Sequence, residues 1–217
     1  MTIQTACFVT LFVAKGFLAP IMSAMRRLPS LLLLLSACSG PEPDTHSKDP
    51  YERYLGLREI AEERAIASES EVVRLVDDPH YLVVTGALEV MAAFGRKEYL
   101  PYALPKLEVK EKDRERENHP MVRAQACTTV AVCGGAEGLG PVLGALAADP
   151  DPAVRRAAVK VLAARYGKDP RVLQALVAAV GEKDPGLSYM AHTKLAELTG
   201  RKDIPRSRDA WAAVVQP

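Results

Sequence analysis

Apolar side chains recur every three or four positions along most of the chain that follows residue 50. In the stretch 152–167 the apolar positions fall at i, i+3, i+4, i+7 and i+8, and they are Val154, Ala157, Ala158, Val161 and Leu162. This spacing is typical of an amphipathic helix, which buries one stripe of its surface. The pattern therefore predicts helices.

The same stripe occurs in four stretches, each of which opens with a proline and closes with a glycine. The stretches are 79–95, 120–134, 152–167 and 185–200. Their final glycines, Gly95, Gly134, Gly167 and Gly200, are 39, 33 and 33 residues apart. Proline favours the first turn of a helix, and glycine accepts the left-handed conformation that often follows the last turn. A period of this length indicates stacked supersecondary units.

Further apolar segments lie between these stretches, at 98–107, 139–147 and 171–180. Because neither helix of such a pair can bury its stripe alone, we expect each unit to be two antiparallel helices stacked on the next unit. Residues 51–68 are predicted to hold an N-terminal capping helix. Residues 201–217 are too few for another unit, and Trp211 is predicted to cover the last repeat as part of a C-terminal cap.

These units resemble HEAT repeats, most closely the short HEAT-like repeats of bacteria. The strongest match is residues 149–158, Asp-Pro-Asp-Pro-Ala-Val-Arg-Arg-Ala-Ala, and residues 119–126 form a second copy in which His119 replaces the aspartate. The resemblance covers residues 69–200. It implies an all-α fold, an α-solenoid of about four HEAT-like helix pairs with N- and C-terminal capping helices.

The resemblance also implies roles for the aspartates and arginines of the motif. In HEAT repeats these side chains commonly bond across neighbouring units, so one interpretation of Asp151, Arg123 and Arg155 is a buried or half-buried polar ladder. Val84 stands where arginine is usual, which leaves the first unit outside such a ladder. In HEAT arrays the second helices generally line the concave side. On that interpretation the candidate partner-contact residues are Arg123, Arg155, Arg156 and Lys160.

One stretch interrupts the period. Residues 110–118 contain no apolar side chain and alternate in charge, and they lengthen the first glycine interval to 39 residues. Insertions in repeat proteins map to loops on one face, which is often the binding face. Docking of a charged partner, a solvated loop and an extension of the preceding helix all remain open for this run.

The first 37 residues end in a pattern that is typical of a bacterial export signal. Arg26 and Arg27 supply positive charge, and residues 28–35 are mostly apolar. The sequence Leu35-Ser36-Ala37-Cys38 resembles the lipobox of bacterial lipoproteins. The resemblance implies cleavage before Cys38 and acylation of its thiol and new amino terminus. Residues 38–50 are polar and are predicted to be a flexible tether.

Residues 1–24 precede a signal that is complete without them, and two interpretations remain open. Either the start is misassigned and Met25 is the initiator, or the chain has a longer leader with two apolar segments or a first membrane helix. Lys15 and Pro20 interrupt this stretch, which makes it a poor span, because about 20 mainly apolar residues are needed to cross a bilayer. In diderm bacteria, a serine after the acylated cysteine, here Ser39, is typical of lipoproteins sent to the outer membrane.

The net charge and the candidate reactive residues argue against several classes of function. Three of the 28 basic residues precede Cys38, so the mature chain has 25 basic and 27 acidic residues, and its net charge of about −2 argues against nucleic-acid binding. The four histidines are far apart and no cysteine pair accompanies them, so no metal site is predicted. Residues 134–140 lack the strand and the lysine of a phosphate loop and are predicted to be an inter-helix turn. Cys127 and Cys133 are expected to be small core residues.

We therefore expect a non-enzymatic lipoprotein scaffold that binds an envelope protein or peptide through its repeat surface, as a monomer and without a cofactor. Its expected location is the periplasmic face of the bacterial cell envelope, on the outer membrane in a diderm organism. Two alternatives stay open. Similar short repeats occur in enzymes that attach or isomerise bilins, and a purely structural envelope component would lack a discrete partner.

Overall fold

The computed structural model of the protein describes residues 44–63, 69–109 and 119–215. The leader, Cys38 and the charged run 110–118 lie outside these ranges. Inside them the regular structure consists of α-helices and short 3-10 turns, and the all-α prediction is confirmed.

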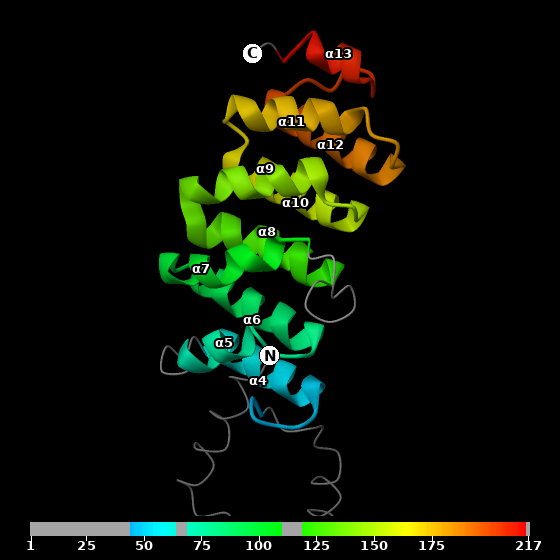
Figure 1. Ribbon diagram of the computed structural model, residues 1–217. Helices are drawn as coiled ribbons and strands as arrows, with labels where there is room; N and C mark the ends of the chain where they lie inside the picture. Colours follow the sequence, from blue (N-terminus) through cyan, green and yellow to red (C-terminus); the bar gives the residue numbers. More distant parts are fainter. Residues whose placement is uncertain (1–43, 64–68, 110–118, 216–217) are drawn as a thin grey trace, which may run out of the picture. The chain divides into compact units, whose positions relative to one another are not determined.

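The regular elements follow one another in chain order. Their bounds are α4 (Pro50–Glu63), α5 (Glu69–Leu75), α6 (Tyr81–Phe94), η3 (Lys97–Tyr99), α7 (Leu100–Ala103), η4 (Leu104–Leu107), α8 (Pro120–Gly134), η5 (Gly135–Gly138), α9 (Leu139–Ala148), α10 (Pro152–Tyr166), α11 (Pro170–Val180), α12 (Pro185–Thr199) and α13 (Arg208–Ala212). Figure 1 shows them stacked in chain order from α4 to α13.

The stack has two layers. In the layer that we call the second-helix layer, α4, α6, α8, α10 and α12 pack each on the next. In the first-helix layer, α5, α7, α9, α11 and α13 lie beside them, and α9 contacts α11, which contacts α13. The pairs α5–α6, α7–α8, α9–α10 and α11–α12 are the four helix pairs of the predicted solenoid. The prediction of an α-solenoid of four helix pairs is therefore confirmed.

Three of the second helices begin with the predicted proline in the first turn, and the residue before that proline caps each of them. His119, Asp151 and Asp184 accept hydrogen bonds from the backbone N–H groups of the first turns of α8, α10 and α12. Such caps satisfy N–H groups that have no partner inside the helix. In α6 the cap is His80, so Pro79 lies before the helix and not in its first turn.

The predicted helix-ending role of glycine holds at two of the four positions. Gly95 and Gly200 have φ of 65° and 73°, the left-handed conformation that ends α6 and α12. Gly134 and Gly167 have φ of −81° and −59°, so their conformation does not require glycine. At Gly167 the reason is space, because an added Cβ would lie 2.3 Å from Leu198 Cδ2.

The N-terminal helix differs most from the prediction. It occupies the second-helix layer, and the sequence Asp49-Pro50-Tyr51-Glu52-Arg53 has the spacing of Asp151-Pro152-Ala153-Val154-Arg155. The Asp49 carboxylate accepts a hydrogen bond from the Tyr51 N–H at 2.8 Å, as a helix cap does. Helix α4 is thus a further second helix. It ends at Glu63, short of the predicted 68, and residues 64–68 lie outside the described ranges.

The residues just before α4 are folded against it, although they were expected to be tether. The Arg53 guanidinium donates from Nη1 to the carbonyl oxygens of Ser47 at 2.8 Å and Lys48 at 3.0 Å. Arg74 of α5 donates to the Thr45 carbonyl at 3.0 Å. The folded part therefore includes residues 44–50, and the predicted tether shortens to 38–43.

The first-helix layer is irregular at its second member. A single helix was expected over 98–107, but the chain forms three short pieces, η3, α7 and η4. Pro101 and Pro105 explain the interruption, because proline removes a backbone donor and its ring crowds the preceding turn. Helices α9 and α11 match their predicted ranges to within one residue at each end.

The core is one continuous cluster that runs through all the repeats. Burying a leucine or valine side chain contributes about 1.5–3 kcal/mol, and each second helix provides several. At the C-terminal end Trp211 is fully buried, and its indole N–H donates to His192 Nδ1 of α12 at 2.9 Å. Helix α13 therefore covers the last repeat, as predicted.

One run in the described residues, Pro120–Ala148, is long and apolar enough to cross a membrane, and an 18-residue window of it has a mean hydropathy of 1.5. Half of that window is buried inside the protein. The run also turns at Gly135, whose φ is 51°, so that α8 and α9 lie in different layers. A buried helix pair of the repeat core accounts for its apolar composition.

The glycine packing generates a prediction about stability. Gly167→Ala is expected to lower the free energy of unfolding by about 1–3 kcal/mol, because the new methyl group would lie 2.6 Å from the backbone oxygen of Ala163 as well as against Leu198. The control is Gly144→Ala in α9, where an added Cβ has nothing within 4 Å. It is expected to raise stability by about 0.5–1 kcal/mol. Urea unfolding followed by circular dichroism measures both, and a neutral Gly167→Ala would contradict the packing role.

Candidate functional site

Arginine–carboxylate pairs connect consecutive repeats. In each pair an arginine near the start of one second helix reaches a carboxylate just before the next second helix. The pairs are Arg53–Asp78 at 2.8 Å, Arg123–Asp149 at 2.7 Å and Arg156–Asp184 at 2.9 Å. A cross-repeat ladder was predicted, and these three pairs form one. We call them the arginine ladder.

The structure changes two members of the predicted ladder. Arg123 pairs with Asp149 and not with Asp151, which instead caps α10 through the Ala153 N–H. Asp78 of the first unit was expected to be outside the ladder because Val84 replaces an arginine. Arg53 of α4 pairs with Asp78 in a two-bond contact, so the first unit is joined to the ladder on its N-terminal side. The arginine missing at Val84 concerns the other side, because α6 has no arginine to reach toward α8.

Arg123 was a candidate contact residue, and the structure places it inside the protein. Only 5% of the residue is exposed, and its Nε and Nη2 donate to the two oxygens of Asp149 at 2.7 and 3.0 Å. A guanidinium and a carboxylate in this parallel arrangement satisfy each other in charge and geometry. A partner at the surface therefore does not reach Arg123, and the ladder interpretation describes it.

Arg155 and Arg156 are half-buried and are also paired. Arg155 Nη1 lies 3.3 Å from Glu182, and Arg156 Nη1 donates to Asp184 at 2.9 Å. The Leu187 N–H is the larger cause of a lowered pKa at Asp184, and Arg156 adds to it. Both arginines thus hold the next repeat. Among the four predicted contact residues, Lys160 alone is exposed.

Lys160 lines a groove that crosses three successive second helices, α6, α8 and α10. We call it the second-helix groove, and its volume is about 580 Å³. Its lining residues are Thr85, Glu89, Met121, Ala124, Gln125, Thr128, Val132, Ala157, Lys160, Val161, Ala164 and Arg165. Small and apolar side chains form most of the surface, and charge comes from Glu89, Lys160 and Arg165. A groove of this size that spans three repeats suits a segment of another chain.

The groove's charges at Glu89 and Arg165 were absent from the predicted contact set. Glu89 lies on α6, where the surrounding atoms remove part of its water and raise its pKa, while Arg58 of α4 partly offsets this. Arg165 lies near the end of α10. A signal was present in the sequence, since both positions fall outside the buried stripe of their helices. The repeat motif does not include these positions, because its arginines lie at the helix starts.

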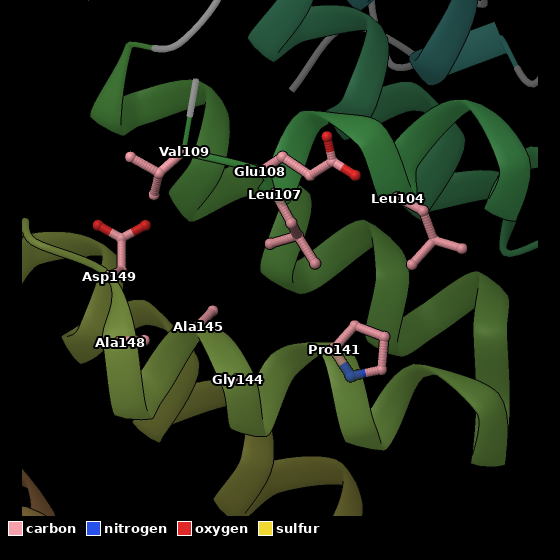
Figure 2. Close-up of a pocket in the computed structure, with 9 residues that line it drawn as sticks. All are labelled: Leu104, Leu107, Glu108, Val109, Pro141, Gly144, Ala145, Ala148 and Asp149. Atoms are coloured by element: carbon pink, nitrogen blue, oxygen red, sulfur yellow. The ribbon is translucent and has the colours of Figure 1, made fainter. Parts of the chain in front are cut away.

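A second groove lies in the first-helix layer, between η4 and α9 (Figure 2). Its volume is about 500 Å³, and it is lined by Leu104, Leu107, Glu108, Val109, Pro141, Gly144, Ala145, Ala148 and Asp149. In Figure 2, Leu104 and Leu107 point from η4 toward α9, and the Glu108 carboxylate is directed away from it. Asp149 is engaged by Arg123. This first-helix groove therefore offers apolar contact but little polar chemistry to select a partner.

Three of the histidines, His80, His119 and His192, and the two described cysteines have structural roles. His80 and His119 cap α6 and α8, and both imidazoles stack on Tyr81, with centroid distances of 4.9 and 4.1 Å. Cys127 and Cys133 are buried free thiols, as expected, and burial raises their pKa to about 12 and about 11. No group of three metal-ligating side chains occurs among the described residues. Cys38 and residues 35–37 lie outside them.

Comparison with known proteins finds a similarity in part of the repeats. Residues 111–196 match the family model for HEAT repeats. The match includes α8 to α11 and most of α12, which are the helices that carry the Arg123 and Arg156 pairs of the ladder and the α8 and α10 sides of the second-helix groove. No curated protein matches the chain.

The positions of the arginines and of Lys160 generate a prediction. Arg123→Ala is expected to lower the free energy of unfolding by about 3–5 kcal/mol, because it leaves the buried Asp149 carboxylate without its partner. Lys160→Ala, on the exposed side of α10, is expected to change it by less than about 0.5 kcal/mol. Urea denaturation of the two variants makes the comparison. Equal, small effects would show that Arg123 is not part of a buried pair.

Proposed function

Since the chain contains HEAT repeats, we propose that it is a non-enzymatic scaffold that binds another protein of the cell envelope through its second-helix layer. The observation that carries the proposal is the second-helix groove, which extends across α6, α8 and α10. Most cationic side chains at the helix starts are used to join repeats. Lys160 and Arg165 are directed to the groove and are available for a partner.

A binding role is supported by how the reactive side chains are used. The two described cysteines are buried thiols with raised pKa values, so they are poor nucleophiles at neutral pH. The imidazoles of His80 and His119 accept hydrogen bonds from helix N-termini, and His192 accepts one from Trp211. These side chains stabilise the repeats. We accordingly propose no catalytic residue and no cofactor.

We further propose that the scaffold is attached to a membrane through lipid on Cys38. The support is the order of positive charge, apolar run and Leu35-Ser36-Ala37-Cys38 in the sequence. Because residue 44 already belongs to the folded part, five residues, or six Cα–Cα steps, separate it from Cys38. Such a chain reaches about 20 Å at full extension. The anchor would therefore keep the N-terminal repeats near the bilayer, and Ser39 favours the outer membrane of a diderm cell.

Fractionation of cells tests the anchor. The wild-type protein is expected in the membrane fraction, and Cys38→Ala is expected in the soluble fraction, because one thioether and one amide-linked acyl group are lost together. Cys7→Ala is the control and is expected to fractionate as wild type. Retention of Cys38→Ala in the membrane to the same extent as wild type would refute the anchor.

Crosslinking in the envelope tests the binding surface. Ala164→Trp places a bulky side chain in the second-helix groove and is expected to reduce the yield of the partner crosslinked to wild type by about tenfold. Ala148→Trp, equally exposed but in the first-helix groove, is the matched control and is expected to keep the yield. Both variants are assayed by quantitative mass spectrometry of purified crosslinked complexes. If Ala148→Trp lost the crosslinked partner and Ala164→Trp retained it, the binding surface would lie on the first-helix layer instead.

A further inference from the structure

In the second-helix groove the negative charge lies on one helix and the positive charges lie on another. Glu89 is the one charged residue in the sequence of α6, and the one in α8 is the buried Arg123. Lys160 and Arg165 line the groove from α10. The groove thus has an anionic wall on α6, an uncharged floor on α8 and a cationic wall on α10.

In the described residues these charges have no directly bonded partner, although Arg58 of α4 acts on Glu89 from a distance. Within the part of the chain that the structure describes, no hydrogen bond or ion pair engages the side chain of Glu89, Lys160 or Arg165. Helices α6 and α10 both pack on α8, and packed helix axes are 8–10 Å apart. The two walls are therefore about 16–20 Å apart, a separation at which charges in physiological salt are strongly screened from each other.

The floor between the walls adds unused hydrogen-bonding groups. The Gln125 amide and the Thr128 hydroxyl have no hydrogen-bond partner among the described residues, and both line the groove. Ala124, Ala157 and Val161 lie around them and supply apolar contact. A bound helix has already satisfied most of its own backbone N–H and C=O groups, whereas an extended segment still offers them. The floor therefore favours an extended ligand.

We propose that the second-helix groove binds an extended segment of a partner protein, in which an acidic side chain meets Lys160 and Arg165 and a basic side chain meets Glu89. An extended chain rises about 3.3 Å per residue, so the two charged residues are five or six positions apart. The backbone between them bonds Gln125, and an apolar side chain contacts Ala157 and Val161. This inference rests on the proposed function and specifies its ligand.

Selection of peptides tests the inference directly. The probe is a phage-displayed library of random nine-residue peptides, selected against the acylated mature protein in nanodiscs. Wild type is expected to enrich peptides that carry an acidic and a basic residue five or six positions apart. Enrichment without this charge pattern, or no enrichment above empty nanodiscs, would overturn the inference.

Charge reversal provides the second arm. The double variant Lys160→Glu, Arg165→Glu is expected to bind the selected peptides at least about tenfold more weakly, because two attractions become repulsions. The double variant Lys168→Glu, Lys183→Glu changes the net charge equally at exposed positions outside the groove and is expected to stay within about twofold of wild type. Equal loss in both variants would overturn the inference, since it would indicate a general charge effect.

The two proposals fail in distinguishable ways. If Ala164→Trp blocks the envelope crosslink and the double variant Lys160→Glu, Arg165→Glu leaves it unchanged, the proposed acidic–basic ligand is wrong and the scaffold function is kept. If neither change affects the yield of the crosslink, both proposals are wrong. A Glu89→Lys variant, reselected against the same library, is expected to exchange the basic residue of the enriched peptides for an acidic one while the preference at the Lys160 end is retained.

Discussion

The arginine ladder is the contact on which the repeat stack depends most specifically. Each apolar stripe could pack against a neighbour in more than one register, but a guanidinium such as Arg123 must meet the carboxylate of Asp149 to be buried at all. Removing one partner of a buried pair costs several kcal/mol, because the other charge stays in the interior. The ladder therefore ties α4, α8 and α10 each to the turn that starts the next second helix.

This constraint sorts the cationic residues into two groups. Arg53, Arg123 and Arg156 are taken up by carboxylates of the following repeat. Lys160 and Arg165 lie farther along α10, beyond the reach of those turns, and face the second-helix groove. Side chains at the helix starts join the repeats, whereas side chains farther along the helices line the groove. Charged side chains therefore remain available in the groove for a partner.

Irregularities in the stack also have local causes. Pro101 and Pro105 divide what would have been a full first helix, and the first-helix groove opens beside the short pieces that result. Gly167 permits Leu198 of the next repeat to approach the end of α10. Small changes of sequence at single positions therefore shape the surfaces of the repeats without altering the order of the helices.

Much of the fold could be predicted from the sequence because the position and the start of a helix depend on residues that are close together in the sequence. Periodicity sets the buried face of a helix, and a capping residue with proline sets its start, so α8, α10, α11 and α12 lie within a residue or two of their expected bounds. The second helix at Asp49-Pro50 was missed although its motif has the right spacing, since the polar residues before it suggested a tether. The same local signals could not tell a buried arginine from an exposed one.

The sequence by itself determined the helical repeat, its pairing into units and the presence of arginines and aspartates able to join them. Only the tertiary structure decided that α4 belongs to the second-helix layer, that Arg123 is enclosed with Asp149, and that Gly167 serves close packing. It also decided that Glu89, Gln125 and Lys160 share one groove. The physical reason is that spacing along a helix sets the direction of a side chain, whereas burial and neighbours depend on which other helix covers it.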